Sequence, residues 1–170
     1  MSTGNAPLSM SFVDMYTRQI KTALEYERAG FVAVNCNEEL RIAAAFMKDA
    51  GFIVEGSSSA LKPIALRSKS ILGDQYMALD IPGARGAYSQ GVILLRSDAP
   101  RSTLVHECVH HLQGCFTGGI RVPVETPYRE CPHEMEAHLI QRAFEMERSP
   151  RSIWVRIKHI LAGWKIPSYL

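Results

Sequence analysis

Apolar residues recur at intervals of three and four positions in five parts of the chain, which is the spacing that buries one face of an α-helix. Asn37 precedes the second of these patterns as an expected N-cap, and Gly51 follows its end. The predicted helices are residues 11–30, 37–51, 100–114, 132–147 and 150–163. The apolar positions expected to face the core are Phe12, Tyr16, Ile20, Ala23 and Leu24 in the first helix, and Met135, Leu139, Ile140, Ala143 and Phe144 in the fourth.

Shorter runs of apolar and β-branched residues predict extended segments. The strongest is residues 88–96, where an apolar run comes directly before the third predicted helix. Because helices and strands both occur in a chain of this length, the pattern favours an α+β domain with N-terminal helices and a small mixed or antiparallel sheet. The first eight residues carry no such pattern and are expected to be disordered. The other extended segments are residues 31–34, 52–55, 63–67 and 75–81.

The composition fits one globular domain. With 170 residues, of which 46% are apolar, the chain can bury a single core, so we expect one domain over residues 1–170. A formal net charge of +2 gives no reason to expect a nucleic-acid partner, and the lack of an apolar run of about 18 residues argues against a transmembrane helix. The first eleven residues do not read as a signal peptide. We therefore expect a cytoplasmic protein, or a periplasmic or secreted one if a signal peptide preceded this sequence and was removed.

The segment His106-Glu107-Cys108-Val109-His110 carries the most informative chemistry. Residues i and i+4 of a helix share a face, so both imidazoles can reach one metal ion at about 2.0–2.1 Å. Glu107 projects about 100° away around the helix, which suits a general base beside the attacking water rather than a ligand. The apolar residues of this helix lie away from the two histidines, so the histidines are expected to face a cleft.

A catalytic zinc ion takes three protein ligands and leaves one position for water. The metzincin pattern would place a third histidine six residues after His110, but that residue is Phe116. The next predicted helix offers Glu134 and Glu136, which lie about 200° apart and cannot face the same ion. Glu134 is the preferred ligand because it shares a face with His138, which would support the site, and Glu136 is the alternative.

This pattern, His-Glu-x-x-His followed 24 residues after its second histidine by Glu134-x-Glu136-Ala137, resembles the compact gluzincin metallopeptidases. These include proteins related to the ImmA and IrrE proteases and uncharacterised bacterial and phage proteins predicted to be zinc peptidases. The resemblance covers residues 100–147 and implies a minimal zincin-like domain, in which an active-site helix precedes a glutamate-bearing helix. It also implies that Glu134 is a ligand. His138 stands where the family has an Asp or Asn that supports the first zinc histidine.

The motif and the resemblance lead us to expect a zinc metallopeptidase that acts on a peptide or protein substrate. His106, His110 and Glu134 would bind Zn²⁺, and Glu107 would be the general base. Two other functions stay open: a metal-containing binding or regulatory protein without catalysis, and a zinc amidase that acts on a non-protein amide. The sequence does not choose among four candidates for stabilising the oxyanion, which are His111, Tyr128, Arg129 and His133.

Other expectations concern the surroundings of the motif. By resemblance to the zincins, the strand at 88–96 lies at the sheet edge, where a peptide could pair with it; the alternative is a core strand. Cys108 is expected in the core. Cys115 and Cys131 flank the segment between the two metal-bearing helices, either as free thiols in a reducing compartment or as a disulfide in an oxidising one. Gln113 continues the histidine face and is expected to contact substrate or the linking loop.

Overall fold

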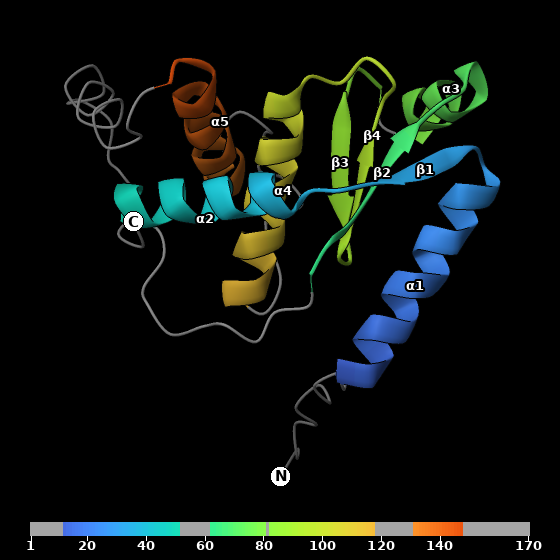
Figure 1. Cartoon of the computed structure of the whole chain (residues 1–170), viewed down its shortest axis with the longest axis horizontal. Helices are drawn as coiled ribbons and strands as arrows, with labels where there is room; N and C mark the ends of the chain where they lie inside the picture. The colour runs from blue at the N-terminus through green and yellow to red at the C-terminus, as the bar shows by residue number, and fades with distance from the viewer. Residues whose placement is uncertain (1–11, 52–61, 81, 118–130, 148–170) are drawn as a thin grey trace, which may run out of the picture.

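A four-stranded mixed sheet lies between two groups of helices (Figure 1). The computed structural model describes residues 12–51, 62–80, 82–117 and 131–147. Within them, the predicted α+β class with a small mixed sheet is confirmed. The strands are β1 (Phe31–Val34), β2 (Ile64–Ser68), β3 (Gly86–Ser89) and β4 (Val92–Leu95). The helices are α1 (Phe12–Arg28), α2 (Asn37–Ala50), α3 (Ile71–Asp80), α4 (Arg101–Thr117) and α5 (Pro132–Glu145).

Three expectations fall outside the described residues. They are the disordered start at 1–8, the strand at 52–55 and the helix at 150–163. The extended segments expected at 31–34 and 63–67 are confirmed as β1 and β2.

The sheet has the strand order β1-β2-β4-β3. β2 pairs with β4 in parallel, whereas β1 with β2 and β3 with β4 are antiparallel. All four residues of β4 are buried, because β4 has a strand on each side and helices on both faces. Its alternate residues point into two cores: Ile93 and Leu95 into one, Val92 and Leu94 into the other. A strand covered on both faces reads as a continuous apolar run, as this segment does.

The helices divide between the two faces of the sheet (Figure 1). On one face α2, α4 and α5 build the larger core, in which Met47, Val105 and Ile140 are buried. On the other face α1 and α3 build the smaller core, to which they contribute Ala23 and Met77. The motif-bearing helix therefore lies in the larger core.

α4 is the most buried helix of the described segments, since residues 102–113 are all buried. It packs against α2, α5, β3 and β4. At its start, Arg101 donates a hydrogen bond to Glu39 at 2.6 Å and pairs with Glu38 at 3.1 Å, and its guanidinium lies over the ring of Phe144 in α5. No described helix combines the length and the apolar character needed to cross a membrane.

The strand predicted at residues 75–81 is wrong, because its described part lies in α3. Ser70 marks the start of this helix, since its Oγ accepts a hydrogen bond from the Gly73 N–H at 3.0 Å in the manner of an N-cap. Ile71, Leu72 and Leu79 are largely exposed, whereas Met77 is buried. The positions of the apolar residues in α3 therefore do not mark its buried face. Ser70 is the residue of the sequence that indicates the start of this helix.

The single strand predicted at residues 88–96 is two strands. β3 and β4 form a hairpin in which Ser89 pairs with Val92, and Gln90 and Gly91 make the turn with φ angles of 50° and 82°. Two successive residues with positive φ are typical of the two-residue loops whose twist suits a hairpin. β3 is the edge strand, and β4, directly before α4, is a core strand.

Three details of the predicted helices are also wrong. Asn37 is the first residue of α2, and the N-cap is Cys36, which makes no side-chain capping bond. α4 does not end at Gly114 but continues to Thr117. Met135 of α5 is 39% exposed rather than buried, because the covered face of α5 is centred on its alanine and isoleucine positions.

The first predicted helix is confirmed as α1, but its buried face differs from the expected apolar one. Tyr16 and Leu24 are about half exposed, whereas Gln19 is only 2% exposed. The Gln19 Nε2 donates hydrogen bonds to the carbonyl oxygens of Lys62 and Gly91, both at 2.8 Å. One amide therefore ties α1 to the approach to β2 and to the turn between β3 and β4.

Replacing this amide tests how much it contributes. Gln19→Ala should lower the free energy of unfolding by about 1–3 kcal/mol, because the Lys62 carbonyl loses the Gln19 donor and the Gly91 carbonyl keeps only its hydrogen bond from the Ile64 N–H. Arg18→Ala, at an exposed position of the same helix, is the control and should change it by less than about 0.5 kcal/mol. Urea denaturation measures both variants. Equal effects from the two would contradict a specific role for Gln19.

Candidate metal centre

Two histidines of α4 lie against α5. His106 and His110 are one helical turn apart, and their Nε2 atoms are separated by 3.1 Å. Their ring centroids are 4.8 Å apart and their planes are inclined by 79°. The sequence predicts that these rings face a cleft, but they are only 6% and 7% exposed because α5 packs over them.

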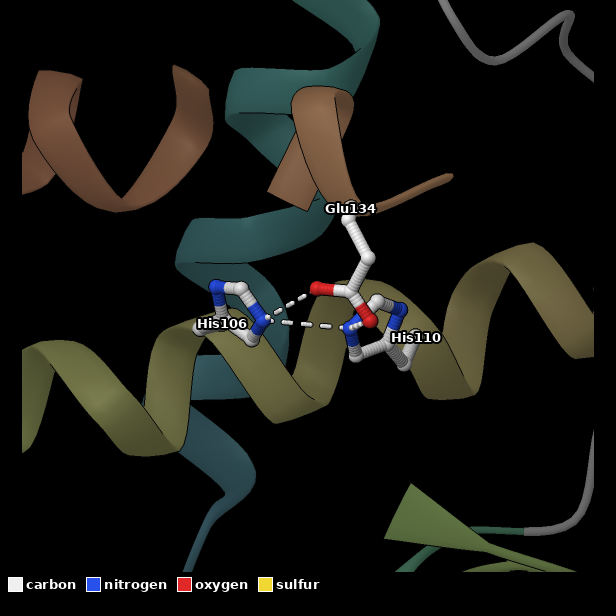
Figure 2. Close-up of side chains that lie close together, drawn as sticks. All are labelled: His106, His110 and Glu134. Carbon is white, nitrogen blue, oxygen red and sulfur yellow. Dashed lines mark hydrogen bonds and ion pairs between the residues drawn. The ribbon is translucent and has the colours of Figure 1, made fainter. Parts of the chain in front are cut away.

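α5 supplies a third side chain. The helix begins at Pro132, whose fixed φ suits the first helical position. Glu134 therefore stands in the first turn, where the helix dipole favours a carboxylate. Its Oε2 lies 3.3 Å from Nε2 of His106 and its Oε1 lies 3.3 Å from Nε2 of His110. Figure 2 shows the carboxylate pointing from α5 towards both rings.

The spacing of these atoms fits one metal ion. One ligand atom from each of the three residues lies within 4.8 Å of the others. Around a tetrahedral ion with bonds of about 2.0–2.1 Å, neighbouring ligand atoms are roughly 3.3–3.4 Å apart. The observed separations of 3.1, 3.3 and 3.3 Å are close to that value. This buried His-His-Glu group, referred to below as the ligand group, can therefore bind a metal ion.

Burial governs the protonation of the two imidazoles. It lowers the pKa of His106, and the hydrogen bond to Glu134 opposes this only in part. Burial also acts to lower the pKa of His110, but the hydrogen bond to Glu134 and the negative charge of Glu107 outweigh it and raise that pKa. Nδ1 of His106 is buried and makes no hydrogen bond within the described residues. The neutral imidazole, which burial favours at His106, is the form that binds a metal.

Glu107 lies between α4 and the edge strand β3. Its side chain is almost wholly buried, and the backbone of Gly86 in β3 faces it. A Cβ atom at Gly86 would lie 2.6 Å from Oε1 of Glu107 and 2.7 Å from Cγ2 of Thr103. Burial raises the pKa of Glu107 to about 7, although the charge of His110 acts to lower it. A carboxyl group with this pKa can both accept and donate a proton near neutral pH.

Glu136, the alternative ligand, is not part of the ligand group. Its carboxylate accepts a hydrogen bond from Nε2 of Gln113, and burial raises its pKa. Gln113 itself contacts the ligand group, since its Oε1 lies 2.8 Å from Nδ1 of His110. The predicted partners of Gln113 were substrate or the linking loop. Its contact with Glu136 could not be predicted, because the crossing of α5 over α4 has no signature in either helix alone.

His138 lies beside the first histidine of the ligand group. Its ring centroid is 4.7 Å from that of His106, with the ring planes tilted by 60°. This is the position that the shared helical face of Glu134 and His138 predicts for a supporting residue.

Two of the four candidates for stabilising an oxyanion are described. Tyr128 and Arg129 lie outside the described residues. His133 directly precedes Glu134 in the first turn of α5, and burial and the charge of His110 lower its pKa. His133 therefore remains a candidate.

His111, the other described candidate, takes part in a separate contact. Its Nδ1 lies 3.2 Å from the Tyr88 hydroxyl and its Nε2 lies 3.5 Å from the sulfur of Cys115. The Tyr88 hydroxyl also accepts a hydrogen bond from the Gly91 N–H. Burial raises the pKa of Tyr88 to about 12, so the neutral phenol can donate to His111. The sequence analysis did not single out Tyr88, because only the register of the hairpin places it against α4.

The four cysteines are all free. Cys108 is wholly buried in the larger core, as predicted. Cys131 is the N-cap residue of α5 and Cys115 contacts His111, so the disulfide considered between them is not formed.

The contact of β3 with Glu107 leads to a prediction. Gly86→Ala should lower the free energy of unfolding by about 1–3 kcal/mol, because the added methyl group overlaps Glu107 and Thr103. Gly114→Ala is the matched control, since a Cβ atom there meets Tyr88 at an ordinary 3.6 Å and alanine favours the helix. Thermal unfolding should show a loss for the first variant and no loss for the second. A Gly86→Ala protein as stable as the wild type would show that the two elements do not approach this closely.

No protein-family model matches this chain, and comparisons with curated proteins and with solved structures also give no match. The likeness to gluzincins therefore remains an expectation drawn from the motif. The features that bear on function are the ligand group and the buried Glu107, whose charge acts on His110.

Proposed function

We propose that this protein is a zinc-dependent metallopeptidase. One observation carries the proposal: His106, His110 and Glu134 converge from two helices on a space suited to one ion. Glu107 directly follows His106 in the sequence, and its buried carboxylate interacts electrostatically with His110 and Glu134. Three ligands with an adjacent acid are the parts that metal-assisted hydrolysis of an amide requires.

The donor atoms favour zinc. Two imidazole nitrogens with one carboxylate oxygen form a ligand set found in catalytic zinc sites, whereas magnesium and calcium prefer oxygen ligands. Three protein ligands leave one coordination position open, while structural zinc sites use four. Cys108 is close in the sequence, but its thiol lies in the core and not in the ligand group. We therefore infer that Zn²⁺ is the resident ion and that its role is catalytic.

Glu107 is the proposed general base. His106, His110 and Glu134 would hold Zn²⁺, and a zinc ion bound there would lower the pKa of a water molecule to about 7 and polarise a substrate carbonyl. The Glu107 carboxylate accepts the proton of the attacking water and delivers it to the leaving amine. Burial raises the pKa of this carboxyl group, which favours its acceptance of a proton, and the backbone of Gly86 lies against its side chain.

A peptide is the proposed substrate because of the place of β3 in the fold. β3 pairs with β4 only, so its other edge has no strand partner among the described residues. It packs on α4 beside Glu107, through Gly86. An extended peptide can add to such an edge through main-chain hydrogen bonds. A peptide bound there would pass close to the proposed base.

Removal of a ligand tests the metal site. His110→Ala should reduce bound zinc from about one ion per chain to nearly none, because two ligands hold the ion far more weakly than three. Zinc should also stop raising the melting temperature of this variant. His111→Ala is the matched control, since it removes a buried histidine of the same helix that contacts Tyr88 instead. The measurements are elemental analysis and thermal unfolding with and without a chelator; an equal loss of zinc in both variants would contradict the assignment.

Replacement of Glu107 tests the chemistry. Glu107→Gln keeps the size of the side chain but cannot accept the proton, so peptide hydrolysis should fall by about 100-fold or more while zinc content stays unchanged. The assay is mass spectrometry of a broad peptide library digested with the zinc-loaded protein. Glu145→Gln is the control, because Glu145 lies on the same helix as Glu134 but contacts Gln141 and Arg142, and it should keep most of the activity. A Glu107→Gln protein as active as the wild type would rule out the general-base role.

A further inference from the structure

Gln113 contacts both helices that carry the ligand group. On its own helix, its Oε1 lies 2.8 Å from Nδ1 of His110. Across the interface, its Nε2 donates a hydrogen bond at 3.0 Å to the carbonyl oxygen of His133, the residue directly before Glu134. The same Nε2 donates to the carboxylate of Glu136. Gln113 is 3% exposed, so water does not substitute for these partners.

These contacts determine which way the amide points. A backbone carbonyl and a carboxylate can only accept hydrogen bonds, so the side of Gln113 that faces His133 and Glu136 must be its NH₂ group. The amide oxygen then faces His110. Since that oxygen only accepts, Nδ1 of His110 must carry a proton and donate it.

In the neutral imidazole, which is the form that binds a metal, a proton on Nδ1 leaves Nε2 of His110 as the nitrogen with the free electron pair. This is the nitrogen that lies 3.1 Å from Nε2 of His106 and 3.3 Å from Oε1 of Glu134. Metal-binding histidines are commonly oriented by a hydrogen bond from their second nitrogen. The acceptor in this chain is an amide oxygen that is itself held by a carboxylate.

We propose that Gln113, held by Glu136, is the positioning residue of the metal site. Gln113 fixes the tautomer and the ring orientation of His110, and through the His133 carbonyl it holds the first turn of α5, from which Glu134 projects. One side chain thus aligns two of the three ligands, one from each helix. This inference rests on the metal site of the proposed function and adds a role for two residues outside the ligand group.

The arrangement is specific to one of the two histidines. Nδ1 of His106 makes no hydrogen bond within the described residues, and its ring is contacted by His138 instead. Substitutions of Gln113 should therefore alter the spectroscopic signals of His110 and leave those of His106 nearly unchanged. A variant that merely loosened the fold would alter both.

The test combines zinc affinity with imidazole NMR of the zinc-loaded full-length chain. Gln113→Met keeps the length of the side chain but removes the polar contacts with His110, His133 and Glu136, and should weaken zinc binding by about 10–100-fold in a chelator competition. In nitrogen-15 spectra, the Nδ1 proton of His110 should exchange slowly with water in the wild type and rapidly in this variant. Gln141→Met is the matched control, because Gln141 contacts Ser102 and Glu145 and no ligand, and it should change the affinity less than about twofold.

Two variants of Glu136 test the same positioning role, and they suffice if Gln113→Met fails to fold. Glu136→Leu removes one of the two acceptors of the Gln113 NH₂ group and leaves only the His133 carbonyl, so it should weaken zinc binding by about 10-fold. Glu136→Gln retains an acceptor oxygen and should recover most of that loss. The inference is overturned, and the metal site stands, if Glu136→Leu binds zinc as tightly as the wild type and the exchange of the His110 Nδ1 proton is unchanged. Gln113→Met, where it folds, should then also bind zinc as tightly as the wild type. A wild-type chain that binds no zinc overturns the proposed function and this inference together.

Discussion

The packing of α5 on α4 is the constraint on which the candidate site depends. It brings the carboxylate of Glu134 to 3.3 Å from two buried imidazoles, an arrangement that costs desolvation energy unless the charges are paired or bind a metal. Neither helix can form the ligand group alone, because α4 supplies only nitrogen donors and α5 only the carboxylate. Metal binding and the docking of the two helices are therefore expected to stabilise each other.

Different faces of the buried helix α4 carry the metal ligands and the proposed general base. Successive residues of a helix project about 100° apart, so His106 faces α5 while Glu107 faces the sheet. α5 completes the ligand group, and β3 encloses the carboxylate of Glu107 and raises its pKa. The side chain of Glu134 is 19% exposed, more than those of His106 and His110, although its Oε2 atom is buried. The sheet and the fifth helix thus each support one part of the proposed reaction.

The parts of this arrangement that follow from helical periodicity could be predicted from the sequence. The pairing of His106 with His110, and the choice of Glu134 as the closer glutamate, needed only the geometry of single helices. Gln113 and Glu136 could not be assigned in this way, because their contact depends on how two helices cross. The same limit explains the failures in the fold. The buried face of α1 includes Gln19, whose backbone carbonyl partners are distant in the sequence. In α3 most of the large apolar residues are exposed, so the apolar pattern does not indicate which face is buried.

X-ray absorption at the zinc edge of the purified, zinc-loaded protein tests the central claim most directly. The account predicts about one zinc ion per chain, with two imidazole nitrogens and light oxygen donors at about 2.0–2.1 Å and no sulfur. Sulfur is a real alternative, because the chain has four free cysteines and one of them, Cys108, stands between the two histidines. A sulfur shell at about 2.3 Å, or no stoichiometric zinc, would contradict the account.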